Sequence, residues 1–118
     1  MIYTTYFTRY DKLQNKNLFP VSIAKYSPKN YTGDAYSKLM PSKEMLFSYK
    51  QTGDVFEYAS KFLAYLNTLN ADEIVSELES LSNGKDIVLL CYENPYKFCH
   101  RTVVRGWLIM NGYECEEL

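Results

Sequence analysis

Apolar residues along the chain fall into short β-branched or aromatic runs and longer stretches with helical spacing, which predicts strands alternating with helices. The DIVLLCYE run is the most apolar and should lie at the centre of a sheet, buried on both faces as parallel strands are. Pro20 and Pro28 set off the second run. YECEEL carries charges that suit an edge strand, because charge discourages pairing with other molecules. The predicted strands are residues 2–7, 21–26, 86–93 and 113–118.

The stretches with helical spacing predict four helices. A helix should begin at Ser42 and stop at Gly53. Asp54 should cap the next helix, VFEYASKFLAYLNTL, and Gly84 should end the third, DEIVSELESLSNG. The fourth is TVVRGWLIMNG. The side chains expected to face the core are Val55, Tyr58, Phe62, Tyr65, Leu66, Leu69, Ile74, Leu78, Leu81, Val103, Val104, Trp107, Leu108 and Met110.

This order of elements predicts an α/β fold. Long connections between strands imply a small, mainly parallel sheet of about four strands covered by helices, a Rossmann-like three-layer arrangement. Residues 27–41 have turn residues and no sustained apolar period, so a loop or one broken helical turn is expected there. Residues 1–118 should form one domain with a helical insertion at about 42–83.

Composition narrows the function classes. The chain has 118 residues, of which 47% are hydrophobic, enough for one core. Lys and Arg total 13 against 14 Asp and Glu, so the broad basic excess of a nonspecific nucleic-acid binder is absent. No run reaches the roughly 18 apolar residues of a membrane span and no signal-peptide pattern appears, so we expect a cytoplasmic protein with no membrane partner. Three cysteines without a secretory signal predict reduced thiols.

The segment CYENPYKFCHR, residues 91–101, concentrates the polar and reactive side chains. It holds two of the three cysteines, the only histidine, a glutamate and an arginine. It follows a predicted strand and leads into a predicted helix, so it should form a strand-to-helix turn. Such turns lie at the carboxyl edge of an open α/β sheet, where ligands usually bind.

A metal site is one interpretation of Cys91, Cys99 and His100, since all three are good zinc or iron ligands. The spacing argues against it, because structural zinc sites usually pair cysteines about two to four residues apart. Adjacent residues at a helix start also point about 100° apart, which would separate Cys99 from His100. We therefore predict no metal and no cofactor, although Glu93 or Cys115 would complete a metal site. Cys91 should act as a small buried apolar residue.

Cys99 and Arg105 match the counting pattern of cysteine-dependent phosphatases, a cysteine followed by five residues and an arginine. In those enzymes the intervening loop offers successive backbone N–H groups to phosphate. Residues 102–104 are expected to be helical instead, which would place Arg105 too far along the helix to close a phosphate cradle. We therefore interpret the match as a coincidence of residue spacing and not as a phosphatase site.

Anion binding is the favoured interpretation of this turn. A helix N-terminus has unsatisfied N–H groups and a partial positive charge, and Arg101 and Arg105 share one helix face, able to grip a phosphate or carboxylate. Glu93 would orient an arginine or meet a ribose hydroxyl. The structural alternative is that Arg101 and Glu93 form a salt bridge, His100 caps the helix and nothing binds.

In these motifs the chain resembles the short members of the domain of unknown function 488 family. The resemblance implies a compact α/β domain of bacteria, archaea or their viruses, and it assigns no reaction. It rests on VLLCYENPYKFCHR (88–101) above all, and on YTTYF (3–7), VSIAKYSP (21–28), YSKLMPS (36–42) and YKQTGD (49–54). The matching residues are Cys91, Glu93, Cys99, His100 and Arg101, and less strongly Tyr6, Ser22, Tyr36, Pro41 and Lys50.

Together these observations predict binding of a phosphate-bearing or nucleotide-like small ligand at the carboxyl edge of the sheet. Arginines would neutralise the anion, and tyrosines would stack on a base. The predicted ligand-binding residues are Glu93, Cys99, His100, Arg101, Arg105, Tyr6 and Tyr36.

Two other functions stay open. An enzyme would use Cys99 as a thiolate nucleophile or His100 as general acid/base, with Arg101 stabilising negative charge. A protein or nucleic-acid interaction module would instead need a contiguous basic and aromatic surface, although solvated loop lysines explain the same residues. That surface would comprise Lys25, Tyr26, Lys29, Tyr31, Lys38 and Lys43.

Overall fold

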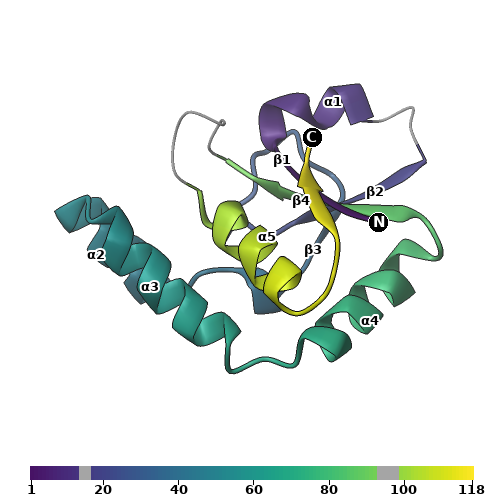
Figure 1. Ribbon diagram of the computed structural model, residues 1–118. Coiled ribbons are helices and arrows are strands. Elements are labelled where there is room, and N and C mark those ends of the chain that lie inside the picture. Colours follow the sequence, from purple (N-terminus) through teal and green to yellow (C-terminus); the bar gives the residue numbers. More distant parts are fainter. Residues whose placement is uncertain (14–16, 93–98) are drawn as a thin grey trace.

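The computed structural model describes residues 1–13, 17–92 and 99–118, and over these ranges the chain forms one sheet of five parallel strands (Figure 1). The strands are β1 (Ile2–Tyr6), β2 (Leu18–Ser22), β3 (Asp34–Ala35), β4 (Asp86–Cys91) and β5 (Cys115–Glu117), and their order across the sheet is β3-β2-β4-β1-β5. β4 lies at the centre, as its apolar sequence predicted, and β5 lies at an edge. The sheet has one strand more than the four expected, because β3 was not predicted.

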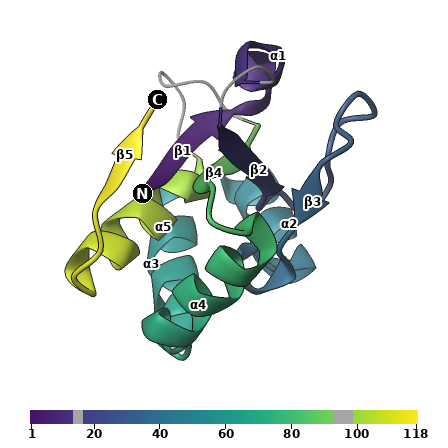
Figure 2. The same ribbon diagram turned by 90° about the vertical axis from the view of Figure 1, so that its right-hand side faces the viewer.

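Helices cover both faces of this sheet, which confirms the three-layer α/β arrangement (Figure 2). On one face, the short helices η1 (Phe7–Arg9) and α1 (Tyr10–Leu13) pack over Val88 and Leu90 of β4. Side chains alternate along a strand, so Leu89 points to the opposite face. That face is covered by α3 (Val55–Leu66), α4 (Ala71–Ser82) and α5 (His100–Met110). None of the helices in the described ranges is long and apolar enough to cross a bilayer.

The helical segment between β3 and β4 begins with an antiparallel pair, α2 (Lys43–Thr52) and α3 (Figure 1). Ser42 begins α2 by accepting the backbone N–H three residues on at 3.2 Å. Gly53 ends α2 with a φ of 66°, a left-handed conformation that glycine adopts without a Cβ clash. Asp54 then begins α3, and its side chain accepts the N–H three residues on at 3.0 Å. Both predicted caps and the predicted turn are confirmed.

The second strand lies earlier in the chain than the sequence predicted. β2 ends at Ser22, so the range 21–26 was wrong, and Pro20 lies inside the strand. In a parallel ladder the N–H and C=O of one residue point to the same neighbour, and those of Ser22 face β3, since its carbonyl accepts a backbone N–H from that side at 3.0 Å. The backbone nitrogen of Pro20, which carries no hydrogen, faces the same side at a point before β3 begins. The Pro20 carbonyl accepts a hydrogen bond from the Tyr31 hydroxyl at 3.2 Å. The proline therefore removes no ladder hydrogen bond.

Other differences concern short elements and three side chains. The stretch 27–41 contains β3 and the 3₁₀ turn η2 (Ser37–Leu39), and the short helices after β1 were not predicted. Val55, Leu81 and Met110, expected to face the core, are 42%, 41% and 65% exposed. Each helix packs only one stripe of residues against the sheet, and these three side chains lie outside the buried stripes of α3, α4 and α5.

Candidate functional site

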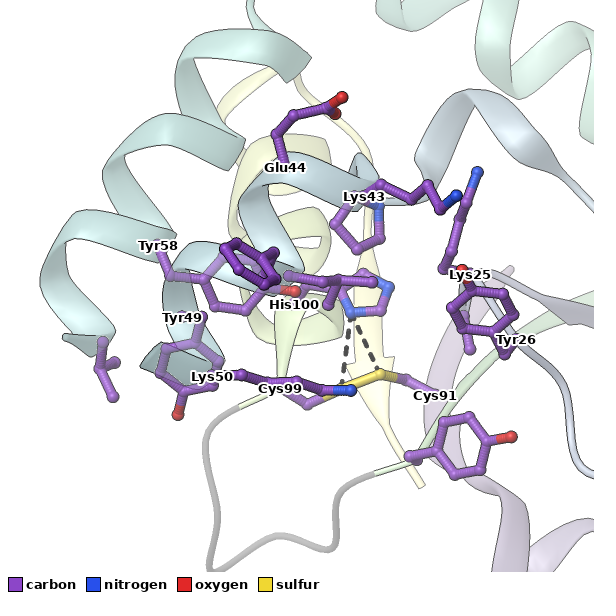
Figure 3. Close-up of a pocket in the computed structure, with 16 residues that line it drawn as sticks. Lys25, Tyr26, Lys43, Glu44, Tyr49, Lys50, Tyr58, Cys91, Cys99 and His100 are labelled. Carbon is purple, nitrogen blue, oxygen red and sulfur yellow. Dashed lines mark hydrogen bonds between the residues drawn. A yellow bond between two sulfur atoms is a disulfide. The ribbon is translucent and has the colours of Figure 1, made fainter. Parts of the chain in front are cut away.

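A pocket of about 870 Å³ opens at the carboxyl ends of β2 and β4 (Figure 3). Its walls come from segments far apart in sequence: residues 24–26 after β2, the end of β4, much of α2, the start of α3 and the start of α5. Ligands of open α/β sheets usually bind outside the carboxyl ends of the strands, and this volume is typical of small-molecule sites. The predicted location of the site is therefore matched by a pocket of suitable size.

The two cysteines and the histidine of the predicted cluster meet in this pocket. Cys91 ends β4 and His100 begins α5, while Cys99 is the N-cap of α5 with an extended backbone, φ −140° and ψ 148°. The Sγ atoms of Cys91 and Cys99 lie 3.3 and 3.8 Å from His100 Nδ1 (dashed lines in Figure 3). The expectation that the side chains of residues 99 and 100 diverge was wrong, because it assumed that both residues are helical.

Cys91 and Cys99 form a disulfide, which corrects the prediction of reduced thiols. The strand and the helix start bring their Cα atoms to 7.0 Å although eight positions separate them in sequence. Cys115 is the free cysteine of the described ranges, and it is buried on β5. Burial raises the pKa of its thiol to about 11. Of the three cysteines, the two that line the pocket are thus the disulfide pair, and the free thiol lies away from it.

His100 is held in one tautomer by a backbone carbonyl. Its Nε2 lies 2.5 Å from the carbonyl oxygen of Ile23, and a carbonyl can only accept a hydrogen bond, so Nε2 carries the proton. Burial lowers the pKa of His100 to about 4, against a smaller opposing effect of the Ile23 carbonyl. The imidazole is therefore neutral near pH 7, and its Nδ1 lone pair faces the two sulfur atoms.

Lysine and tyrosine side chains form the remaining polar part of the pocket. Lys25, Lys43 and Lys50 line it together with Glu44, so three positive charges and one negative charge give it a net charge of +2 while His100 is neutral. In Figure 3, Lys25 and Lys43 lie at one end, and Tyr49 and Tyr58 lie at the other. The rings of these two tyrosines stack with centroids 4.7 Å apart and an interplanar angle of 20°. Tyr26 also lines the pocket.

The predicted arginine pair does not line this pocket. Arg101 is 3% exposed and forms a bidentate ion pair with Glu117 of β5, with Nε 3.1 Å from each carboxylate oxygen and Nη2 3.0 Å from Oε2. Arg105 donates from Nε to the Cys115 carbonyl at 2.9 Å. Residues 101 and 105 therefore turn toward β5, because neighbouring residues of a helix point about 100° apart and His100 already points to the pocket.

The remaining predicted binding residues lie elsewhere or are not described. The Tyr6 ring lies beneath the guanidinium groups of Arg101 and Arg9, at 5.6 and 5.9 Å from their carbons. Tyr36 donates its hydroxyl to Glu77 of α4. Glu93 lies outside the described residues. Cys99 and His100 are thus the predicted ligand-binding residues that line the pocket.

The residues considered for an interaction surface are divided by the structure. Lys25, Tyr26 and Lys43 line the pocket. Tyr31 instead packs edge-on against aromatic rings of the α1 face, and Lys38 pairs with the Glu77 carboxylate of α4 at 3.1 Å. Three of the six residues thus line the pocket, while Tyr31 and Lys38 contact other parts of the chain.

Tyr58 is buried, as predicted, but the sequence did not indicate that Tyr58 and Tyr49 also line the pocket. A usable signal was present in the motifs shared with the 488 family, because Pro41 and Lys50, two of their weaker matches, line it as well. When residues from several motifs shared with one family come together in the structure, they indicate a common site, even if no single motif indicates it alone.

Comparison with known proteins gives one family match. A family model described as DUF488-N3a, active DUF488-N3 subclade, matches residues 9–112. No curated protein and no solved structure matches the chain. The matched region contains the whole pocket lining, from residue 24 to residue 100.

Proposed function

The chain belongs to the domain of unknown function 488 family, within the subclade described as active DUF488-N3, and from its site we propose that it binds a phosphate-bearing or nucleotide-like small ligand in the pocket at the carboxyl edge of the sheet. The observation that carries this proposal is the combination of three lysines with stacked tyrosine rings in one pocket.

The lysines supply the attraction for an anion. Lys25, Lys43 and Lys50 come from two separate segments and converge on the same pocket, whereas the predicted arginines are engaged with β5. The ammonium group of a lysine is a point charge on a flexible side chain, and it attracts phosphate. This attraction is stronger inside a partly enclosed pocket, where the charges have less contact with water. Lysines thus replace the predicted arginines as the anion-binding groups, and the proposed ligand class is the same as the one predicted from the sequence.

The tyrosines supply a surface for a flat ring. Tyr49 and Tyr58 already stack face to face, so the exposed side of such a pair offers a continued stack to a base or nicotinamide-like ring. Burial raises the pKa of Tyr58, so its hydroxyl stays protonated and the wall stays uncharged near it. An anionic group at the lysine end and a ring at the tyrosine end describe a nucleotide better than plain phosphate.

Thermal unfolding with defined probes tests this proposal. The wild-type protein would be melted with inorganic phosphate, ribose 5-phosphate, AMP, ADP and NAD⁺. We expect at least one nucleotide to raise the melting temperature by about 5 °C or more at saturating concentration, because a compound that binds the native state must stabilise it.

Variants then place the binding site. Lys43→Ala and Lys50→Ala should each weaken the affinity for that nucleotide by about tenfold, the loss of one charge-assisted contact. Lys12→Ala is the matched control, because Lys12 is exposed on α1, across the sheet from the pocket. The proposal fails if none of the probes stabilises the wild type, or if the pocket variants bind as tightly as the control.

A further inference from the structure

Three buried side chains place soft metal-binding atoms together at the pocket. The Sγ atoms of Cys91 and Cys99 and a ring nitrogen of His100 all lie within 4.8 Å of one another. All three residues are at most 5% exposed, yet all three line the pocket. Thiolate sulfur and imidazole nitrogen are the donors that zinc-type ions prefer.

The Nδ1 atom of His100 lacks a proton donor in the disulfide form. Its contacts in the described chain are with the sulfurs of Cys91 and Cys99, and a disulfide sulfur carries no hydrogen. Because Nε2 holds the ring proton for Ile23, Nδ1 can only accept. A buried nitrogen lone pair is therefore aimed at the sulfur pair with nothing there to satisfy it.

The distances agree with a tetrahedral metal site. With metal–sulfur and metal–nitrogen bonds of about 2.3 and 2.0 Å, the sulfur–nitrogen edge of a tetrahedron is about 3.5 Å. The observed distances to Nδ1 are 3.3 Å from Cys91 Sγ and 3.8 Å from Cys99 Sγ. Once the disulfide is reduced, the sulfurs need only separate from each other, while the nitrogen already has the required position.

The surroundings of His100 also suit a metal ligand. Metal-binding histidines usually donate their second ring N–H to a carbonyl or carboxylate, which fixes the ring and makes the other nitrogen a better donor. The Ile23 carbonyl has this role here. The rings of Phe62 and His100 pack nearly perpendicular to each other, with centroids 5.3 Å apart, and this contact further restricts the rotation of the imidazole.

From these observations we propose that the reduced protein binds one zinc-class divalent ion through Cys91 Sγ, Cys99 Sγ and His100 Nδ1. Three protein donors leave the fourth tetrahedral position open, and it faces the pocket, as in catalytic rather than structural zinc sites. A water molecule or an oxygen atom of a bound ligand completes the coordination there.

The chemistry balances with a named reductant. A phosphine takes up oxygen from water as it donates two electrons to the disulfide, and two protons give two thiols. Binding of the divalent ion then replaces both thiol protons, which are released to solvent, and leaves two thiolates and a neutral imidazole around the metal. Oxidation of the two sulfurs to the disulfide excludes the metal, so the two states are alternatives.

Metal binding to reduced and oxidised protein tests the proposal directly. Wild-type protein would be reduced anaerobically with a phosphine, dialysed against Zn²⁺ and measured for metal content. We expect one zinc per chain in the reduced protein and none in the disulfide form. Co²⁺ in place of zinc should give the intense near-ultraviolet band of sulfur-to-cobalt charge transfer, together with the visible absorption of tetrahedral cobalt.

The variants identify the ligands. Cys91→Ser and Cys99→Ser should each weaken zinc binding by more than about 100-fold, since loss of even an outer partner of a metal ligand costs about 10- to 100-fold. Cys115→Ser is the matched control, because Cys115 is a buried cysteine on β5 that does not line the pocket, and it should bind zinc as the wild type does. Circular dichroism would confirm that each variant is folded.

The result that overturns the proposal is equally clear. Reduced, folded wild-type protein that binds no more zinc than its disulfide form excludes the site, and so does binding that survives Cys99→Ser or is lost in Cys115→Ser. Since the oxidised wild type serves as a folded control, the test does not depend on the stability of any variant. It contains no nucleotide, so its outcome is separate from that of the ligand proposal.

Discussion

The imidazole of His100 donates a hydrogen bond to the carbonyl oxygen of Ile23, 77 positions earlier in the chain. The N–H of Ile23 in turn donates to the Leu90 carbonyl at 3.0 Å. The start of α5, the residue after β2 and the end of β4 are therefore joined by consecutive polar contacts as well as by apolar packing. The sulfur and imidazole groups are thus attached to β4, the central and most buried strand of the sheet, which holds them in fixed positions.

Two glycine substitutions should change stability in opposite directions. Gly53→Ala should lower the free energy of unfolding by about 1 kcal/mol, because the φ of 66° is costly for a residue with a Cβ. Gly106→Ala should raise it by about 0.5–1 kcal/mol, because alanine is favoured in an exposed helix interior. A Cβ added at either position meets nothing within 4 Å. Urea unfolding of both variants isolates the backbone effect, and equal shifts of the same sign would contradict it.

The ion pair of Arg101 and Glu117 should stabilise the fold and leave the pocket unaffected. Glu117→Gln should lower the unfolding free energy by about 2 kcal/mol or more, because the guanidinium is 3% exposed and loses a charged partner. Glu116→Gln is the control, since this neighbouring side chain on β5 is exposed. Unfolding by urea gives the energies, and nucleotide affinity at the pocket should be unchanged in both variants. A loss of affinity in folded Glu117→Gln would reverse the assignment of Arg101 to a structural contact.

Cys115 should be unreactive in the native protein and should destabilise it at alkaline pH. Its pKa is raised from 9.0 to about 11, chiefly by burial, so iodoacetamide at pH 8 should modify it only after unfolding. The thiol loses its proton near pH 9 in the unfolded chain and near pH 11 in the folded one. The contribution of the protonated thiol to the free energy of unfolding is therefore fully present below about pH 9. It is lost between about pH 9 and 11, and the loss amounts to up to about 3 kcal/mol.

Comparison of wild-type protein with Cys115→Val measures this contribution. Between about pH 9 and 11, the unfolding free energy of the wild type should fall more steeply with pH than that of the valine variant. The difference in stability between the two proteins should therefore shrink or change sign across this range. Rapid labelling of native Cys115 at pH 8 would show that the thiol is accessible after all.

Tyr49 should discriminate nucleotides from plain phosphate. Tyr49→Leu keeps an apolar side chain but removes the stacking ring, so the affinity for AMP should fall by about fivefold or more. The affinity for inorganic phosphate should stay the same, because phosphate has no ring to stack on Tyr49. Calorimetric titration of both ligands checks the prediction. An equal loss for AMP and phosphate would mean that the substitution disturbs the pocket as a whole.

Much of the fold could be predicted because its signals are local. Ser42, Gly53 and Asp54 mark the turn between α2 and α3 through backbone hydrogen bonds a few residues long, and the apolar run of β4 identifies the centre of the sheet. Pro20 shows the limit of this reasoning. A proline is excluded from a strand only where its N–H is needed, and that depends on how far the neighbouring strand extends.

The candidate site was only partly predictable because it depends on the direction of helix faces. The strand-to-helix turn and the residues Cys99 and His100 were identified from their types and spacing. The role of Arg101 depends on Glu117, which lies 16 positions later on β5, and no local pattern signals that partner. The contribution of Lys50 depends on α2 packing beside the pocket, which is set by tertiary contacts with α3 rather than by the α2 sequence itself.

The pocket wall formed by α2 has less buried apolar packing than the walls formed by the other elements. None of its ten residues is fully buried, whereas α3, α4 and α5 each bury several. Amide hydrogens of α2 should therefore exchange with solvent faster than those of β4 and α5, since local opening needs little apolar surface to separate. Such local opening would move Lys43, Tyr49 and Lys50 of α2 outward and leave the sulfur and imidazole groups in place. We therefore expect α2 to adjust to proposed ligands of different lengths, while the side of the pocket formed by β4 and α5 stays fixed.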